Sequence, residues 1–403
     1  MKNKKSLFIG FLLGILLMII VNGLFSVNNI LNFGAGRNNK DIMEQYEDKT
    51  NMLTAYLNKF YLEDIEVDGL LEGGYKGFVQ AVGDPYTQYY DEEEFKKLIE
   101  DLTGKYAGIG ALVSVDPKDK LPIIITPFEG SPSEKAGLQP LDKIMKVNDE
   151  DISGIILDDV VKKMKGEEGT EVTITILRKN KEEVKIFDVV LERQIINVPT
   201  VGHRMLKDDI GYLQIIGFDD VTYDQFMKAL NDLETQNEKG LIIDLRNNPG
   251  GSLEIVSKIA DELLPKGVIV YTEDKNGKKE YINSDDEKQF NKPIVILINE
   301  NSASASEVLS GAIKDYNAGK LVGTTSFGKG LVQQIRPLPD GSAMKITIAK
   351  YYTPSGNYIH GKGIEPDYKV ELPEELKYKQ GLKEEEDVQL LKAIEVIKED
   401  INK

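Results

Sequence analysis

The sequence of 403 residues contains no cysteine, and this absence removes several kinds of chemistry at once. Without cysteine there is no disulfide framework, no thiolate nucleophile and no cysteine-based zinc site. Basic clusters are also missing beyond the N-terminal lysines, and 50 basic against 67 acidic side chains give a net charge of −17. This charge pattern argues against nucleic acid as a partner. Any catalysis must use oxygen or nitrogen chemistry.

Histidine is almost as scarce, since only His203 and His360 occur. Neither lies in a glycine-framed or strand-end segment typical of a catalytic turn, and we interpret His360 as a loop residue. The HExxH pattern of metalloproteases is absent as well. A serine–lysine dyad is therefore a better catalytic hypothesis than a histidine-based triad.

The N-terminus carries an uncharged apolar run at 7–25, preceded by three lysines within the first five residues. This run is long enough to span a bilayer. Lysines before it orient the N-terminus towards the cytoplasm and place the rest of the chain outside. A cleaved signal peptide is the alternative, but residues 21–25 offer no clear pair of small residues for cleavage. We expect an uncleaved, single-pass anchor within residues 1–40.

The length predicts two or three domains, and the patterning changes along the chain. Apolar residues at helical spacing predict two or three amphipathic helices in 41–103. Short β-rich runs around one helix predict a small barrel-like module in 104–192. Strands alternating with helices in 193–370 predict an α/β architecture with a largely parallel sheet. The region 371–403 contains a charged helical pattern, interpreted as a packing or dimerisation helix, which leaves a homodimer open.

A candidate nucleophile follows the apolar strand expected at 294–298. The chain there enters small residues and then a helix, and Ser304 lies in the turn. Such a turn exposes a serine at the sheet edge beside free backbone N–H groups, which can stabilise an oxyanion. The alternative is an N-cap serine with small-residue packing.

A candidate base, Lys329, stands between Gly328 and Gly330 after another apolar strand. The two glycines let the backbone approach closely while the lysine is directed inward. To act as a base near pH 7 the lysine must be neutral, so burial must lower its pKa far below the ordinary value. An ordinary surface lysine is the alternative.

A third segment, 241–252, ends a strand in a Pro249-Gly250-Gly251 turn that opens a helix. Its backbone N–H groups are candidates for the second oxyanion donor. A phosphate-binding loop is disfavoured, because the Walker lysine and serine do not follow the glycines.

Taken together, residues 244–251, 302–307 and 327–330 resemble the signatures of the C-terminal processing (tail-specific) peptidases. Twenty-five positions separate Ser304 from Lys329, in agreement with the family dyad, and this spacing selects Ser304 over the neighbouring serines. The segments 83–87 and 363–367 extend the resemblance over nearly all of the chain beyond the anchor.

The resemblance implies a crotonase/ClpP-like α/β protease core with an inserted PDZ domain, and no metal or organic cofactor. It also implies roles for single residues. Ser304 would be the nucleophile, Lys329 the general base, and Gln333 would orient the lysine. Ala305 and either Gly250 or Gly251 would donate to the oxyanion. Asp244, Arg246 and Glu307 would support the site. For Asp244 and Arg246 a purely structural ion pair stays open.

The middle module resembles a PDZ domain, with Gly108, Ile109 and Gly110 in the position of the loop that captures a chain's terminal carboxylate. A ligand would then add as a strand to the sheet edge. The segment 130–138 is similar to the helix-to-turn segment of PDZ modules in bacterial proteases. This implies polypeptide substrates with apolar C-terminal tails.

The module departs from the family at three positions. Leu141 and Asp149 stand at expected turns where the family usually has glycine, which eases positive φ. Lys165 stands where the family often has an arginine, which in some members couples the PDZ position to the active site. Lysine lacks the bidentate fork of arginine, which argues against the same coupling through Lys165.

These observations predict a serine endopeptidase that cleaves extracytoplasmic polypeptides near their C-termini through an acyl-enzyme. A PDZ scaffold on a degenerate core is a second hypothesis, against which the joint presence of Ser304, Lys329 and Gln333 argues. A crotonase-like enzyme acting on acyl thioesters is a third. The outside location would deprive that enzyme of coenzyme A.

Overall fold

The computed structural model describes residues 39–179, 183–285, 289–377 and 382–403. The chain divides into two compact units, Met1–Tyr75 and Lys76–Lys403. The membrane segment predicted at 7–25 lies outside the described residues. No helix among the residues that are described has the length and apolar character needed to cross a bilayer.

The first unit contains helix α2 (Asn39–Phe60) and the beginning of helix α3 (Val67–Gln80). Met52, Tyr56 and Phe60 follow one another at intervals of four along α2, and all three are exposed. The rings of Tyr56 and Phe60 stack with their centres 6.0 Å apart. Together with α4 in the second unit, these helices confirm the helical pattern of this region.

In the second unit, strand β1 (Gln88–Tyr90) leads into helix α4 (Glu92–Thr103). Asp91 begins the helix with a capping box, since its side chain accepts the N–H of Glu94 and the Glu94 carboxylate accepts the N–H of Asp91. Gly104 ends it in a left-handed conformation with φ 62°.

The module after α4 is a small antiparallel β structure with the strand order β3-β4-β5-β7-β8, while β2 pairs separately with β9. Ile124, Ile144 and Ile174 are fully buried in its core. The single long helix expected in this region is α6. The bounds are β2 Lys105–Gly108, β3 Ala111–Val115, β4 Pro122–Pro127, α5 Pro132–Lys135, β5 Lys143–Val147, β6 Glu150–Asp151, α6 Leu157–Met164, β7 Glu171–Lys179, β8 Val184–Glu192 and β9 Gln194–Asn197.

Two turns of this module adopt the backbone conformation expected from their sequence position. Leu141 has φ 74° and Asp149 has φ 63°, in the left-handed region that favours glycine. Leu141 is also 72% exposed, so its side chain contributes little packing.

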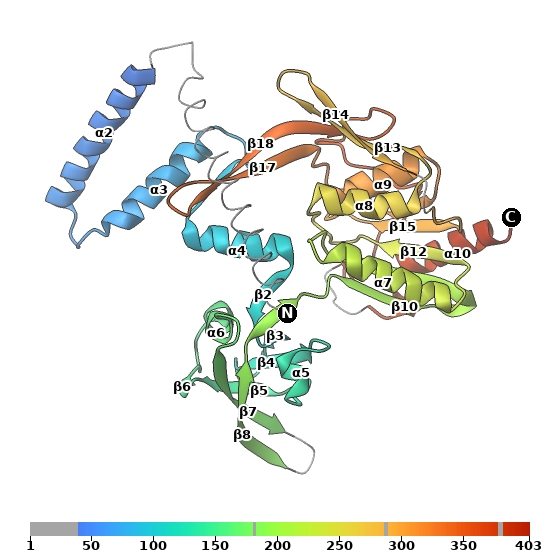
Figure 1. The fold of residues 1–403 in the computed structure, drawn as a ribbon, viewed down its shortest axis with the longest axis horizontal. Helices are drawn as coiled ribbons and strands as arrows, with labels where there is room; N and C mark the ends of the chain where they lie inside the picture. Colours follow the sequence, from blue (N-terminus) through green and yellow to red (C-terminus); the bar gives the residue numbers. More distant parts are fainter. Residues whose placement is uncertain (1–38, 180–182, 286–288, 378–381) are drawn as a thin grey trace, which may run out of the picture. The chain divides into compact units, whose positions relative to one another are not determined.

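The region after β9 is built on a six-stranded sheet in the order β10-β11-β12-β15-β16-β19 (Figure 1). Every pair is parallel except β10 with β11, which confirms the largely parallel sheet. The bounds are β10 Val201–Met205, η1 Lys207–Asp209, β11 Ile210–Ile215, α7 Thr222–Thr235, β12 Gly240–Asp244, α8 Leu253–Leu263, β15 Ile294–Ile298, α9 Ala305–Asp315, β16 Lys320–Gly323, β19 Tyr368–Lys369, η2 Glu384–Glu386 and α10 Val388–Ile401.

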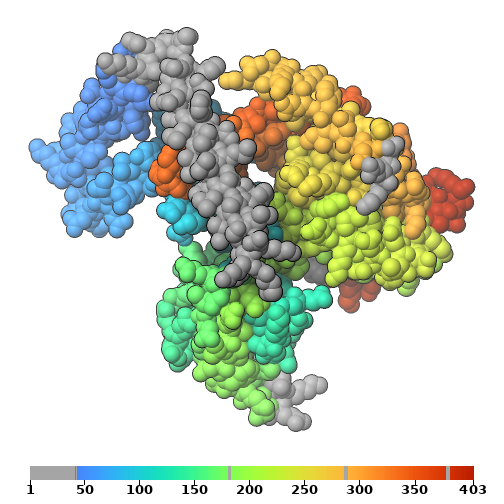
Figure 2. All heavy atoms as spheres, in the orientation of Figure 1, coloured from blue at the N-terminus to red at the C-terminus, as the bar shows by residue number. Residues whose placement is uncertain are grey.

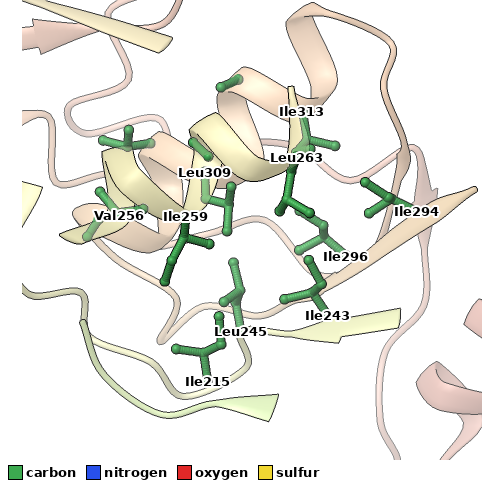
Figure 3. Packing of buried hydrophobic residues seen from close by; sticks show 14 of the residues in the cluster. Ile215, Ile243, Leu245, Val256, Ile259, Leu263, Ile294, Ile296, Leu309 and Ile313 are labelled. Carbon is green, nitrogen blue, oxygen red and sulfur yellow. The ribbon is translucent and has the colours of Figure 1, made fainter. Parts of the chain in front are cut away.

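Helices cover both faces of this sheet because its strands are apolar on both sides. Ile243 and Ile296 point towards α8 and α9, where Leu309 packs among them (Figure 3). Ile242 and Val295 point the other way, into a cluster with α10. In the space-filling view, α7 and α8 form one continuous yellow-green to yellow surface (Figure 2). The core therefore consists of two apolar layers, one on each side of the sheet.

A second, antiparallel sheet was not predicted from the sequence. Its path is β1-β18-β13-β14, and β17 pairs with β18. Strand β1 joins it by pairing Gln88 with Lys345, far away in the chain. The bounds are β13 Gly267–Asp274, β14 Lys279–Ser284, β17 Leu331–Pro337 and β18 Ala343–Tyr352.

Candidate active site

Ser304 occupies a sharp turn between β15 and α9. Its backbone has φ 54° and ψ −114°, a conformation that costs a non-glycine residue on the order of 1–3 kcal/mol. The preceding loop is fixed, because the Ser302 hydroxyl donates to Leu245 O at 2.8 Å and the Ala303 N–H donates to Asn248 O at 3.1 Å. Strain of this kind persists only where the surroundings over-determine it, as they do around Ser304.

The buried carboxylate of Glu307 connects the serine turn with the lysine loop. Its Oε2 accepts the N–H of Ser304 at 2.9 Å and the N–H of Lys329 at 2.8 Å. Its Oε1 accepts the Ser326 hydroxyl at 2.5 Å and the Gly328 N–H at 2.7 Å. One side chain from the first turn of α9 thus fixes the backbones of both candidate catalytic residues.

Lys329 is largely buried, as a catalytic base requires. Burial, together with the positive charge of Lys345, lowers the pKa of Lys329 below its ordinary value, while Asp84 and Glu307 act in the opposite direction. The Lys329 ammonium lies 4.8 Å from the centre of the Tyr86 ring. A larger fraction of this lysine is therefore neutral near pH 7 than of an exposed lysine.

A cavity of about 520 Å³ brings several predicted residues together. Ser304, Ala305, Gly251, Lys329 and Gln333 all line it, along with apolar side chains from α4, α8, α9 and β17. Neither histidine of the chain lines it. A mostly apolar cleft with a few convergent polar groups is the usual form of a binding or active site.

The two glycines of the Pro249-Gly250-Gly251 turn differ in their hydrogen bonds. The N–H of Gly250 donates to Asn248 Oδ1 at 2.8 Å, so it is already engaged. Gly250 also has φ 107°, and a Cβ there would lie 2.7 Å from Ala303 O. Within the described residues the N–H groups of Gly251 and Ala305 have no acceptor. The geometry favours Gly251 over Gly250 as the oxyanion donor of the pair.

The two candidate catalytic side chains are close to one cavity but are not in direct contact. In the described part of the chain no hydrogen bond joins Ser304 Oγ to Lys329 Nζ, and Gln333 donates to Thr347 Oγ1 at 3.3 Å. Hydrogen bonds of catalytic residues are often long or misaligned before a substrate binds. Direct contact between Ser304 and Lys329 would require the side chains of Lys329 and Gln333 to reorient.

Asp244 and Arg246 do not line the cavity. Arg246 Nη2 donates to Asp244 Oδ2 at 2.6 Å and to Asp387 Oδ2 at 2.8 Å. The Tyr212 hydroxyl donates to the same Asp244 oxygen at 2.7 Å. Asp387 caps α10, where it accepts the N–H of Leu390 at 3.0 Å. This network is a structural link from the end of β12 to the C-terminal helix.

In the PDZ module, Ile109 and Gly110 turn their carbonyl groups towards the segment 128–133. Ser133 donates to Ile109 O through its N–H at 2.9 Å and its hydroxyl at 2.7 Å. Phe128 N–H donates to Gly110 O at 2.9 Å. Because a trans peptide directs its N–H opposite to its carbonyl, the N–H of Gly110 points away from Ser133. Gly108 belongs to β2, where it pairs with Gln194.

Sequence reasoning missed two residues of the cavity region. Tyr86 contacts the Lys329 ammonium through its ring, and Lys345 lines the cavity from β18. Tyr86 lies in the segment 83–87, which the family resemblance included without a role. No sequence pattern pointed to Lys345, because the sequence did not predict that its strand lies beside the serine turn.

Peptidase family S41 matches residues 209–370, and the PDZ domain matches residues 124–178. The chain is 38% identical over 328 residues to the carboxy-terminal processing protease CtpA of Bacillus subtilis (strain 168), covering 81% of this chain and 69% of that protein. It is 37% identical to a protein named as a CtpA-like serine protease of Staphylococcus aureus (strain COL), covering 92% of this chain and 73% of that protein.

A solved structure assigned as an S41 protease of Bacteroides fragilis NCTC 9343 has the same fold, with a TM-score of 0.52 at 16% identity over 80% of this chain and 90% of that chain. The similarities define a serine-type peptidase with a PDZ domain. The chain belongs to peptidase family S41, with relatives among the carboxy-terminal processing proteases.

Proposed function

We propose that this chain is an endopeptidase that cleaves polypeptides near their C-termini by acyl transfer. Ser304 Oγ attacks the peptide carbonyl, Lys329 takes its proton, and water later releases the acyl group. The N–H groups of Ala305 and Gly251 stabilise the oxyanion. The observation that carries this proposal is the Glu307 carboxylate, which fixes the backbones of Ser304 and Lys329 at one cavity.

Activation requires Lys329 to turn from the Tyr86 ring towards Ser304, with Gln333 leaving Thr347 to hold the lysine in its new position. The lowered pKa of Lys329 sets the pH dependence. Protonated lysine cannot accept the serine proton, so activity should rise with pH as Lys329 loses its proton. The midpoint of this rise should lie below the ordinary pKa of a lysine.

Substrate recognition is assigned to the PDZ module. The outward N–H of Gly110, in the loop with Gly108 and Ile109, is suited to a terminal carboxylate, and the tail would pair with the sheet edge beside it. Polypeptides with apolar C-terminal tails are the expected substrates. The resemblance that led to this assignment is supported by the PDZ match at 124–178.

The proposal also includes a membrane anchor at 7–25 and a catalytic part outside the cytoplasm. Its support is the sequence pattern of lysines followed by an apolar run. Intact-mass measurement of the protein purified from membranes tests it. A retained N-terminus and membrane fractionation agree with an anchor, whereas a mass loss of the first segment indicates a cleaved signal peptide.

The decisive experiment is cleavage of an unfolded protein with an apolar C-terminus by the full chain in detergent, followed by mass spectrometry. The parent should cleave, while Ser304→Ala and Lys329→Ala should not. Lys228→Ala removes an exposed lysine of α7 and should behave as the parent. Cleavage by Ser304→Ala would refute the nucleophile. A parent that binds the tail without cutting would support a scaffold instead.

A further inference from the structure

A second lysine extends into the cavity that contains Ser304. Lys345 lies on β18, opposite Ile335 of β17, and its side chain is half-buried. Its ammonium lies 5.2 Å from the centre of the Tyr90 ring. Within the described part of the chain, Lys345 has neither a hydrogen-bond acceptor nor a carboxylate partner. The cavity therefore contains a positive charge without a counter-ion.

The carboxylates that flank β1, the strand paired with β18 at Lys345, already have other partners. Asp91 and Glu94, which follow β1, bind the ammonium of Lys76 at 3.1 and 2.8 Å. Asp84, ahead of β1, accepts the N–H of Tyr86 at 3.0 Å and the hydroxyl of Thr87 at 2.6 Å. A half-buried ammonium without a partner gains more from an incoming anion than an exposed or paired one does.

The rest of the cavity restricts where an anion can lie. Asp220 also lines it and repels a carboxylate from its part of the wall, while Glu254, another lining residue, is paired with Lys258 at 2.6 Å. Lys329 is the other cation of the wall. It must give up its proton during the reaction, so it cannot serve as a permanent counter-ion. Lys345 is left as the residue suited to hold an anionic group throughout the reaction.

We propose that Lys345 binds a carboxylate of the substrate inside the active-site cavity, and so determines which peptide bond reaches Ser304. The carboxylate is either the α-carboxylate of the chain end or an acidic side chain beside the cleaved bond. This inference rests on the proposed peptidase function and adds a specificity-determining residue to it.

Matched peptides test the inference with the full chain. One pair differs only in a free or amidated C-terminus, and the other only in Asp or Asn beside the cleaved bond. In Lys345→Gln we expect kcat/KM for the preferred carboxylate peptide to fall about tenfold, mainly through KM, as expected for a lost charged hydrogen bond. At a pH above the acidic limb of the profile the uncharged partner should change little, and Lys345→Arg should retain the preference. The pair that responds identifies the source of the carboxylate.

The pH profile provides a second readout. Because the charge of Lys345 lowers the pKa of Lys329, Lys345→Gln should shift the acidic limb of kcat/KM to higher pH, even with amidated peptide. Equal loss on every peptide with an unmoved limb would overturn the inference and leave the peptidase intact. A parent that cleaves no peptide would instead refute the proposed function, so the two failures are distinguishable.

Discussion

Two buried carboxylates of the protease region are satisfied in different ways. Glu307 accepts four neutral donors, three backbone N–H groups and one hydroxyl, all from the serine turn and the lysine loop. Asp244 instead binds the guanidinium of Arg246 and the hydroxyl of Tyr212. The family resemblance implied a supporting role for both, with a purely structural ion pair left open for Asp244, and the structure gives the two carboxylates different partners.

The Glu307 network holds the backbones of Ser304 and Lys329, whereas the Asp244 network holds two secondary-structure elements together. Neutral donors hold Glu307 without adding a cation near Lys329, whose deprotonation depends on its electrostatic surroundings. A guanidinium can neutralise Asp244 because this carboxylate lies away from the cavity and links β12 to α10. We therefore expect changes at Glu307 to affect catalysis first and changes at Arg246 to affect stability first.

The largest effect is expected from Arg246→Ala. It leaves Asp244 and Asp387, which are 1% and 4% exposed, without their shared cation. Breaking a buried ion pair from one side costs about 3–5 kcal/mol. Urea unfolding should show this loss, whereas Arg204→Ala, at an exposed arginine, should cost far less. Similar losses in both variants would contradict the structural role of the network.

Glu307→Gln should reduce kcat about a hundredfold. The amide offers one acceptor oxygen where the carboxylate offers two, so at least one N–H of the serine turn or lysine loop loses its partner, at a cost of up to about 3 kcal/mol. Tail-peptide binding to the PDZ module should not change. Glu234→Gln, at an exposed position of α7, is the matched control. Wild-type kcat in Glu307→Gln would remove Glu307 from the catalytic geometry.

A smaller effect, a gain in stability instead of a loss, is expected in the PDZ module. The position lies next to the ion pair of Asp142 and Arg178. Leu141 precedes Asp142 with φ 74°, so Leu141→Gly should stabilise the module by about 1 kcal/mol. Leu112→Gly, an exposed leucine in extended backbone, should destabilise instead. Denaturant titration of the three proteins compares them. A loss in Leu141→Gly would show that its side chain contributes packing.

The smallest effect concerns Asp219, a carboxylate that has no hydrogen bond or ion pair within the described residues. Burial and the charges of Asp101 and Asp220 raise its pKa to about 6. A raised pKa means that its stabilising effect is present at low pH and lost as pH rises through about 6. Asp219→Asn should gain less than about 1 kcal/mol near neutral pH and nothing near pH 4, since the group is partly solvated.

Thermal unfolding at both pH values measures the Asp219 effect, with Asp224→Asn as an exposed control. A gain that is the same at both pH values would mean that the asparagine acts through packing. Absence of any stability gain would show that the Asp219 carboxylate is fully hydrated in the folded protein.

The alternation of apolar strands with helices was sufficient to predict the parallel sheet. Runs such as 241–243 and 294–298 are apolar on both faces, which is typical of strands covered by helices on both sides. The antiparallel sheet was not predictable in the same way. Its pairing of β1 with β18 joins residues far apart in the chain, and each strand alone carries no information about its partner.

The residues of the candidate site also differ in whether the sequence alone could point to them. Ser304 and Lys329 lie in a small-residue turn and a glycine-framed loop, whose local pattern made them candidates before any contact was known, whereas the role of Glu307 came from the family resemblance. The hydrogen bond that removes Gly250 from the oxyanion donors depends on the amide of Asn248, which no spacing rule reveals. Lys345 reaches the cavity from the second sheet, and Tyr86 lies against the Lys329 ammonium just ahead of β1, so both required the structure.

Pairing of β1 with β18 has a consequence for synthesis of the chain on the ribosome. The PDZ strands all lie between Lys105 and Asn197, so this module can fold while the later residues are still being made. The candidate active site cannot assemble this early. Tyr86 contacts Lys329 and Gln88 pairs with Lys345, and both lysines lie in the last third of the chain. If the proposed function holds, a nascent or prematurely terminated chain would bind substrate tails without cleaving them, because its PDZ module folds before the active site is assembled.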